Sequence, residues 1–494
     1  MAIADFHCHV SFKPTLALKE DRPDCWTNIK SPILGSIVNS QSNLTQLAQG
    51  NVNLVFATLY GLEPGVAKQF LLHLVDPIVP VLDRRQLKKL SDASITSNES
   101  VREEIAALEA HAAEVGKPKK VKLIRSGADY DPTDAGTIHL ALNMEGGHNL
   151  YGPGNNGRNE KKVEENLLWF KKPDSPRLFY LGLAHLEQNR LTTHASGIKI
   201  FGKRAFLPDG AGLRYLGKRV AELAMADTGR KIFIDTRHMS LESRKDFYDW
   251  KRSSAFRNEP ILCSHAGVTG ISWNDAMPIV RAKYQKQWMV WKLEYTARPD
   301  TLVPGTHFNP CSINLYNEDI VEVAKSGGII GVSLDIRILG GKVKGLREFV
   351  SAGEKDQFPT HVPEEKVTIS KLLDDDDQRD EADEPAEQYT ADEKSPDFGM
   401  RHLVNNILHI VKVCTAAGIA DPWGHVALGS DYDGLIAPIG GYEHAGKLTS
   451  MSADLETYLA KYAQQAHVNI PDVKAAVGKF MHGNAHAFLV KHFK

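Results

Sequence analysis

Residues 3–10 read Ile3-Ala4-Asp5-Phe6-His7-Cys8-His9-Val10, a short apolar run with two histidines near its end. Side chains alternate along a β-strand, so His7 and His9 would share one face and Cys8 the other. Imidazoles about 7 Å apart at a strand end can both reach a metal ion. A lone His-x-His is common by chance, so its meaning depends on the rest of the chain.

Seven further runs of this kind follow, most of them succeeded by loop residues and then by helical periodicity. The eight predicted strands are Ile3–Val10, Asn51–Tyr60, Thr137–Gly146, Leu178–Leu186, Lys231–Met239, Pro260–Gly267, Gly327–Ile336 and His425–Gly434. Amphipathic helices are predicted at Leu213–Ala226, Glu318–Lys325 and Met400–Ala417. Repeated strand–helix alternation predicts an α/β fold, a (β/α)8 TIM barrel whose strands all end at one mouth.

The connections between these strands are unequal, with long insertions at about 61–136, 147–177, 268–317 and 337–399. We interpret residues 1–494 as one barrel domain whose long βα loops shape access to a site. Asp374–Glu393 holds eleven acidic residues and one arginine. We interpret this segment as a solvated, mobile loop, with docking of a partner as the alternative.

Composition excludes several classes of protein. The formal net charge of the 494 residues is −2 without a basic cluster, which argues against a nucleic-acid partner. No run of about 18 apolar residues and no signal-peptide pattern is present, so neither a membrane span nor secretion is expected. The five cysteines are an odd number without a Cys-x-x-Cys pair, which fits a reducing, cytoplasmic location.

Ligand-type residues recur near the carboxyl ends of the predicted strands. Glu145, His238, His265 and Asp431 each follow an apolar run, as His7 and His9 do. A buried charge is costly unless it is paired or bound to metal, so several at one barrel end indicate a metal site. Arg237 precedes His238, and strand alternation would turn it away from the barrel axis, which favours a structural role.

Two motifs resemble the renal (membrane) dipeptidase family of the amidohydrolase superfamily. They are Glu145-Gly146-Gly147-His148 and Gly429-Ser430-Asp431-Tyr432-Asp433-Gly434, in this order. His185 after Leu181-Gly182-Leu183-Ala184, the pair Ser264-His265 and Gly483-Asn484-Ala485 also match. The resemblance covers the barrel from end to end and skips the insertions.

The resemblance implies two divalent metal ions, with zinc as the first choice. His7 and His9 would bind the first ion and His238 with His265 the second, while Glu145 would bridge them. Asp431 would contact the first ion and carry the proton of the reaction. His185 would stabilise the developing oxyanion, a role that only the resemblance suggests.

The chain departs from the family pattern at two places. His9 stands where the family has an aspartate, which would leave the metal pair more positive. The family's carboxylate-binding arginine has no counterpart before Asn314-Leu315; Arg281 and Arg298 lie in the preceding insertion.

These observations predict a metal-dependent hydrolase that uses a water bridging two ions to cleave an amide in a dipeptide or N-acyl amino acid. A lactone or ester hydrolase is the alternative, because the same ions can attack either carbonyl. A catalytically silent barrel that binds a partner is an alternative of another class. The expected partner is a small-molecule substrate, and the oligomeric state, a homodimer included, stays open.

Overall fold

The computed structural model describes most of the chain. The described residues are 2–16, 24–30, 39–69, 83–92, 94–152, 158–196, 204–227, 230–296, 301–341, 346–358, 362–373 and 395–494. The acidic segment Asp374–Glu393 and Arg298 lie outside them.

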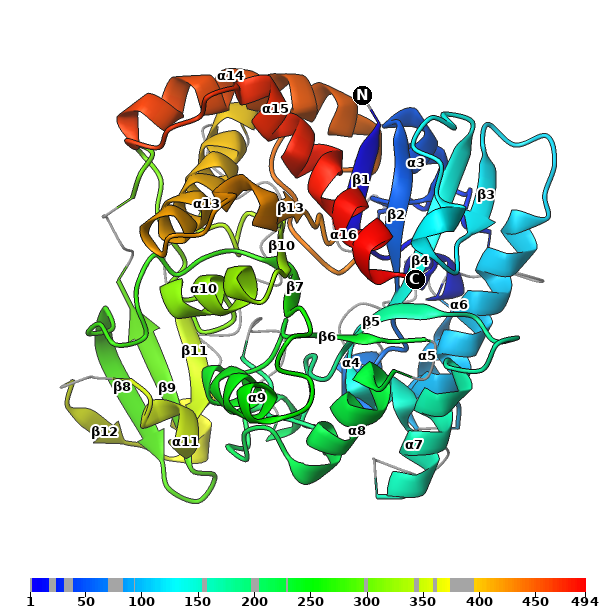
Figure 1. Ribbon diagram of the computed structural model, residues 1–494. Helices are drawn as coiled ribbons and strands as arrows, with labels where there is room; N and C mark the ends of the chain where they lie inside the picture. The colour runs from blue at the N-terminus through cyan, green and yellow to red at the C-terminus, as the bar shows by residue number, and fades with distance from the viewer. Residues whose placement is uncertain are drawn as a thin grey trace.

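Eight parallel strands form a nearly closed barrel, in the order β1-β2-β4-β5-β6-β7-β10-β13 (Figure 1). The strands are β1 Ile3–Cys8, β2 Val52–Leu59, β4 Thr137–Met144, β5 Leu178–Gly182, β6 Phe233–Asp235, β7 Leu262–Ala266, β10 Ile329–Val332 and β13 Val426–Leu428. The last strand meets the first where the Asp431 amide donates to the carbonyl of His7 at 2.8 Å. All eight strands predicted from the sequence are present, and the predicted barrel is confirmed.

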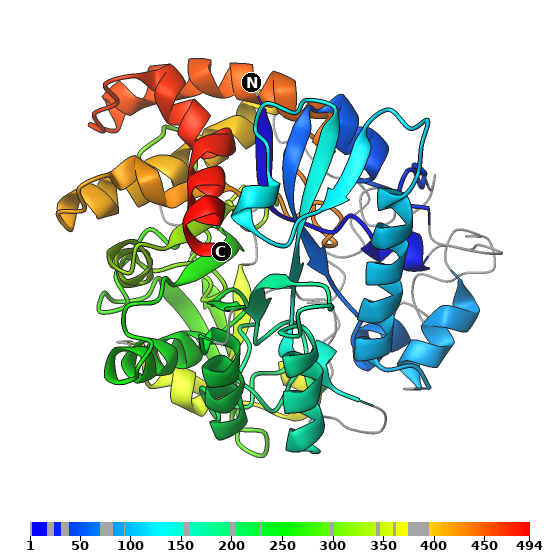
Figure 2. The same cartoon turned by 45° about the vertical axis from the view of Figure 1, so that its right-hand side comes forward.

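Helices alternate with these strands along the chain (Figure 2). The longer ones are α6 Ser97–Ala112, α7 Glu160–Trp169, α8 Tyr215–Met225, α9 Leu241–Ser253, α10 Asn317–Lys325, α13 Pro396–Ala416, α14 Leu448–Gln465 and α16 Asn484–His492. The shorter ones are α1 Phe12–Leu16, α3 Leu44–Gln49, α4 Pro64–Gln69, α5 Arg84–Ser91 and α15 Val473–Gly478. The three predicted helices correspond to α8, α10 and α13. No helix within the described ranges is long and apolar enough to cross a membrane.

Aromatic side chains fill the barrel beneath the strand ends. Phe6, Phe56, Phe179 and Phe233 come from four different strands and belong to one buried cluster. Phe488 of α16 packs against three of these rings, with centroids 5.8–6.5 Å apart. The interior is therefore a packed core, and polar side chains are left to gather at its carboxyl end.

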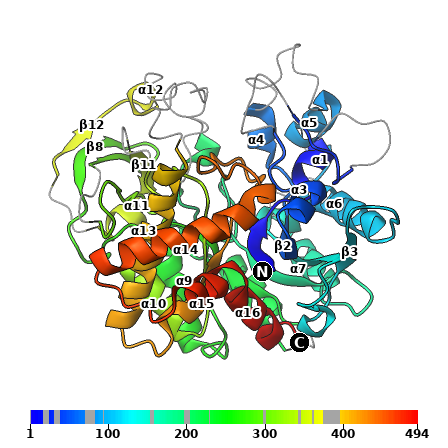
Figure 3. The same ribbon diagram turned by 90° about the horizontal axis from the view of Figure 1, so that it is seen from above.

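The insertions build a second, four-stranded sheet that the sequence did not predict. Its order is β11-β9-β8-β12, with β8 Ile279–Gln285, β9 Val290–Tyr295, β11 Arg347–Ser351 and β12 Glu364–Lys366. Two short helices, α11 Ala352–Lys355 and α12 Ile369–Leu372, accompany it, and β3 Lys120–Leu123 extends the barrel sheet beside β4. In Figure 3 the inserted sheet and the helices α4 and α5 lie on opposite sides of the same end of the molecule.

Candidate metal centre

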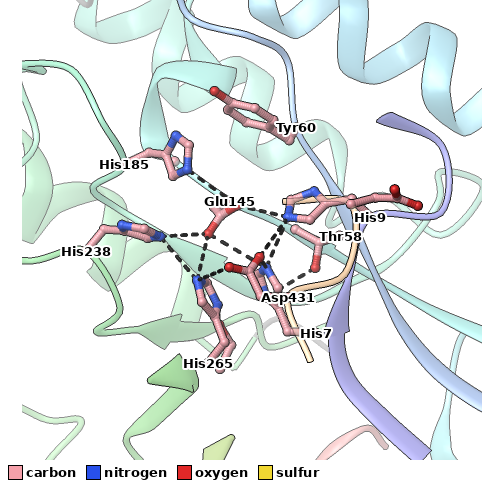
Figure 4. A network of polar contacts seen from close by, with 12 residues as sticks. His7, His9, Thr58, Tyr60, Glu145, His185, His238, His265 and Asp431 are labelled. Atoms are coloured by element: carbon pink, nitrogen blue, oxygen red, sulfur yellow. Dashed lines mark hydrogen bonds and ion pairs between the residues drawn. The ribbon is translucent and has the colours of Figure 1, made fainter. Parts of the chain in front are cut away.

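The residues predicted as ligands come together at the carboxyl end of the barrel (Figure 4). His9 Nε2 lies 3.2 Å from Glu145 Oε2 and 3.3 Å from His7 Nε2. Asp431 Oδ1 approaches both imidazoles, 3.7 Å from His7 and 3.6 Å from His9. One half of the predicted ligand set thus surrounds one side of Glu145.

The other half of the set lies close to Glu145 Oε1, an atom that is also 3.7 Å from His7 Nε2. His238 Nε2 is 3.0 Å from Glu145 Oε1, and His265 Nε2 is 3.4 Å from the same atom. The two imidazole nitrogens are 3.2 Å apart, and His265 also lies 3.7 Å from Asp431 Oδ2. Glu145 therefore lies among all four histidines, with imidazole nitrogens close to both of its carboxylate oxygens.

Two of these side chains depend on an unusual backbone. His238 and Asp431 have positive φ angles of 63° and 62°, a left-handed conformation that non-glycine residues seldom adopt. Such strain persists where the surrounding structure enforces it, and it gathers at functional sites. Both residues lie just beyond the end of a strand: His238 follows β6, which ends at Asp235, and Asp431 follows β13, which ends at Leu428.

Burial and neighbouring charges shift the pKa values of the side chains in this cluster. Burial would raise the pKa of Glu145, but the neighbouring histidines, His185 and His7 first, hold it well below its ordinary value. Burial would lower the pKa of His9, yet its contacts with Asp431 and Glu145 raise it to about 10. Burial lowers the pKa of His238 to about 3, so this imidazole is neutral at pH 7 and can offer a lone pair.

The donor set fits divalent metal ions. Three overlapping groups have their ligand atoms within 4.8 Å of one another: His7, His265 and Asp431; His7, His9 and Glu145; Glu145, His185 and His238. Facing imidazole nitrogens and carboxylate oxygens in a buried site are the ligands that zinc and similar ions take. The geometry accommodates such ions, while their identity and number belong to the proposal below.

A glutamate that the sequence analysis missed holds His185. Glu63 Oε1 accepts a hydrogen bond from His185 Nδ1 at 2.8 Å and from the Leu186 amide at 3.2 Å. The hydroxyl of Tyr60 donates to the other oxygen of Glu63, which is only 2% exposed. These contacts direct His185 Nε2 toward Glu145 Oε2, 3.6 Å away. The sequence held one clue to this residue, since Glu63 lies only four residues beyond the end of β2.

One cavity reaches this cluster, and its lining corrects the interpretation of Arg237. The lining includes His9, His185, Asp431 and, contrary to the alternation argument, Arg237. Strand β6 ends at Asp235, and the following turn, with its left-handed residue His238, cancels the alternation on which that argument rested. Arg281, by contrast, lies on β8 with its side chain 61% exposed and 3.5 Å from Glu294.

Comparison with known proteins gives a likeness in structure alone. No family model and no curated protein matches this chain. Among solved structures, the probable dipeptidase PvdM from Pseudomonas aeruginosa superimposes with a TM-score of 0.52 at 14% identity, covering 100% of this chain and 96% of that one. The chain has the fold of that protein. The fold expected from the resemblance to renal dipeptidases is thereby confirmed.

A second solved structure is a metallopeptidase from Rhodobacter sphaeroides, liganded with a phosphinate mimic of the dipeptide L-Ala-D-Ala. It matches at 15% identity with a TM-score of 0.48, over 100% of this chain and 99% of its own. At 14% identity the match to PvdM shows a shared fold alone, and the chemistry of the present chain is argued from its own residues.

Proposed function

We propose that this protein is a metal-dependent hydrolase that cleaves an amide bond in a small peptide or N-acyl amino acid. The observation that carries the proposal is the gathering of seven ligand-type side chains from six strand ends, five of which line one cavity. His7 and His9 would hold one divalent ion, His238 and His265 a second, and Glu145 would contact both. Asp431 would complete the first site, and zinc is the first candidate for both positions.

Bound ions would supply Lewis acidity, which polarises the scissile carbonyl and makes an attacking water more acidic. Asp431, whose pKa burial raises, faces the cavity and would accept the proton of that water. It would return the proton to the departing nitrogen as the C–N bond breaks, so that acid and amine are the products.

His185 is placed to stabilise negative charge on the carbonyl oxygen. Burial alone would lower its pKa, but Glu63 and Glu145 raise it, so the ring can carry protons on both nitrogens. With Nδ1 engaged by Glu63, Nε2 is the donor left to face the cavity.

Metal analysis of the purified protein tests this function. We expect stoichiometric zinc, manganese, iron or cobalt in the native protein and a loss of metal in His238→Ala. His482→Ala is the control, since that imidazole pairs with Tyr130 at 2.7 Å and lies in no predicted ligand group. Native protein without bound metal and without amide turnover would refute the proposal.

A lactone or other ester is the second candidate substrate. The renal dipeptidase family has an arginine shortly before the position of Asn314 that binds the substrate's carboxylate, and this chain has none there. A lactone or simple ester has no free carboxylate and so does not require that arginine. Turnover of a lactone panel at a kcat/KM above that of every amide tested would favour this candidate.

A further inference from the structure

Arg237 lines the cavity with a charged guanidinium group, one of whose N–H donors has no hydrogen-bond partner among the described residues. Its side chain is only 4% exposed, and Nη1 donates to the carbonyl of Ile313 at 2.6 Å. Nε is buried without a hydrogen-bond partner among the described residues. Leaving guanidinium donors unpaired is costly, so these donors favour an anionic ligand group in the cavity that Arg237 lines.

The carboxylates that line the same cavity are already engaged. Among the described lining residues they are Glu145, Asp335 and Asp431. Asp335 is paired with Arg337, whose Nε lies 2.9 Å from Oδ1 and whose Nη2 lies 2.6 Å from Oδ2. Glu145 and Asp431 face the predicted metal ligands. The described lining therefore offers no spare carboxylate to pair with a substrate ammonium group.

Apolar side chains form the neighbouring part of the wall. Ile313 and Ile338 line the cavity and are buried, and Ile313 is also the residue whose carbonyl holds Arg237. A ligand whose carboxylate meets Arg237 would thus place an adjoining aliphatic group beside these isoleucines.

We propose that the cavity selects N-acylated amino acids with an aliphatic side chain over free dipeptides. Arg237 binds the α-carboxylate, Ile313 and Ile338 contact the side chain, and the acyl nitrogen carries no charge. Water adds to the acyl carbon and the C–N bond breaks, releasing a carboxylic acid and a free amino acid. This specificity rests on the proposed function, because it assumes that the metal centre hydrolyses an amide.

Three substrates compared on the native holoenzyme test the selection. They are N-acetyl-L-leucine, its primary amide N-acetyl-L-leucinamide, and the dipeptide L-alanyl-L-leucine. A lost charge-assisted hydrogen bond corresponds to about 10- to 100-fold. We expect kcat/KM for N-acetyl-L-leucine to exceed that for the amide by this factor, and that for the dipeptide by at least about 10-fold. Equal or faster turnover of the dipeptide, or equal turnover of acid and amide, overturns the proposal.

Substitution assigns the effect to Arg237. In Arg237→Met we expect kcat/KM for N-acetyl-L-leucine to fall about 10- to 100-fold, chiefly through KM, while kcat/KM for the amide falls much less. Arg237→Lys should recover part of the loss, because it keeps the charge without the fork. Arg281→Met is the matched control and should behave as the native protein. A preference for the acid over the amide that persists in Arg237→Met overturns the assignment, and metal content with melting temperature shows whether each variant is folded.

A binding measurement separates failure of this inference from failure of the proposed function. If the native protein binds no metal and hydrolyses none of the three substrates, the proposed function fails. Calorimetric titration of the holoenzyme with 4-methylpentanoate and with 4-methylpentanamide still tests the anion site. Binding of the acid that weakens at least about 10-fold in Arg237→Met supports the site; equal binding by both proteins refutes it. If Arg237→Met does not fold, two measurements test the anion site instead: kcat/KM of Arg237→Lys for N-acetyl-L-leucine, and the ratio of kcat/KM for the acid to that for the amide in the native protein.

Discussion

Asp431 occupies a backbone position that few residues tolerate, and this determines which substitution is informative there. Its φ of 62° lies in the left-handed region, where asparagine is as acceptable as aspartate. Asp431→Asn therefore keeps the backbone and a carbonyl oxygen facing His7 and His9 while removing the basic group. We expect kcat to fall at least about 100-fold, the usual contribution of a general base, with metal content retained. Steady-state kinetics and metal analysis check this, and near-native turnover would exclude a proton-carrying role.

Glu63 acts through His185, so its loss should affect turnover without removing metal. Glu63→Leu deletes the acceptor of the His185 Nδ1 hydrogen bond, and we expect kcat to fall about 10- to 100-fold with KM little changed. Glu63→Gln, which keeps an acceptor oxygen, should lose less. Glu354→Gln is the control, because that buried glutamate accepts from the Leu241 amide and lies outside the cavity lining. Equal kcat in Glu63→Leu and the native protein would contradict the positioning role.

Single residues also show what the sequence could and could not predict. Glu145, His238, His265 and Asp431 were found because each follows an apolar run, and strand ends in a barrel converge. Glu63 and the direction of Arg237 were missed, because both depend on turns whose backbone angles no periodicity reveals. The ligand and catalytic roles themselves remain predictions.

At the scale of elements, the barrel was predictable and the inserted sheet was not. Each barrel strand is a local apolar run followed by its own helix, so eight repetitions define the architecture. In the inserted sheet, β9 pairs with β11 and β8 with β12, strands that lie more than 50 residues apart. Pairings of this kind join two separate insertions, and neither segment alone carries the pattern.

Helix α6 is joined to the segment that follows strand β1 through a buried acid, Glu104, whose titration should be visible in stability. Glu104 accepts from Ser11 Oγ at 2.6 Å and from the Tyr60 amide at 2.9 Å. Burial raises its pKa from the model-compound value of 4.5 to about 8. The folded state therefore binds more protons than the unfolded state between these values, so stability declines as pH rises through this window.

Glu104→Gln mimics the protonated acid and should remove this contribution. Relative to the native protein, the variant should gain stability as pH rises from about 5 to 8, reaching a few kcal/mol, on the order of 1.4 kcal/mol per pH unit at most. Urea unfolding of both proteins at several pH values measures the difference. A difference independent of pH would show that Glu104 is ionised throughout.

Helices α9 and α10 are joined by a buried ion pair beneath the loop that carries Ile313. Arg244 Nε lies 3.0 Å from Asp319 Oδ1, and Arg244 Nη1 donates to the Met239 and Ser312 carbonyls, both at 2.8 Å. Arg244→Met strands a buried carboxylate and should cost about 3–5 kcal/mol of unfolding free energy. Arg252→Met, on the same helix but 55% exposed at its side chain, should cost less than about 1 kcal/mol. Similar losses in the two variants by urea unfolding would contradict this assignment.

At the scale of the whole molecule, the predicted metal centre joins the first strand of the barrel to the last. His7 belongs to β1 and Asp431 follows β13, the two strands that close the barrel, and histidines from β6 and β7 complete the cluster. Ions held there would bind the folded chain and not the unfolded one. By mass action they would stabilise it by about 4 kcal/mol when their free concentration is 1,000 times Kd.

Removal of the ions with a chelator should therefore lower the melting temperature of the entire protein by several degrees, in a single transition. We expect a single transition because the predicted ligands come from strands distributed around the barrel. Readdition of zinc should restore the melting temperature. The triple variant His238→Ala/His265→Ala/Asp431→Ala, which lacks ligands of both predicted sites, should melt at nearly the same temperature with and without chelator. An unchanged melting temperature in the chelated native protein, with metal loss verified by elemental analysis, would mean that closure of the barrel does not depend on the ions.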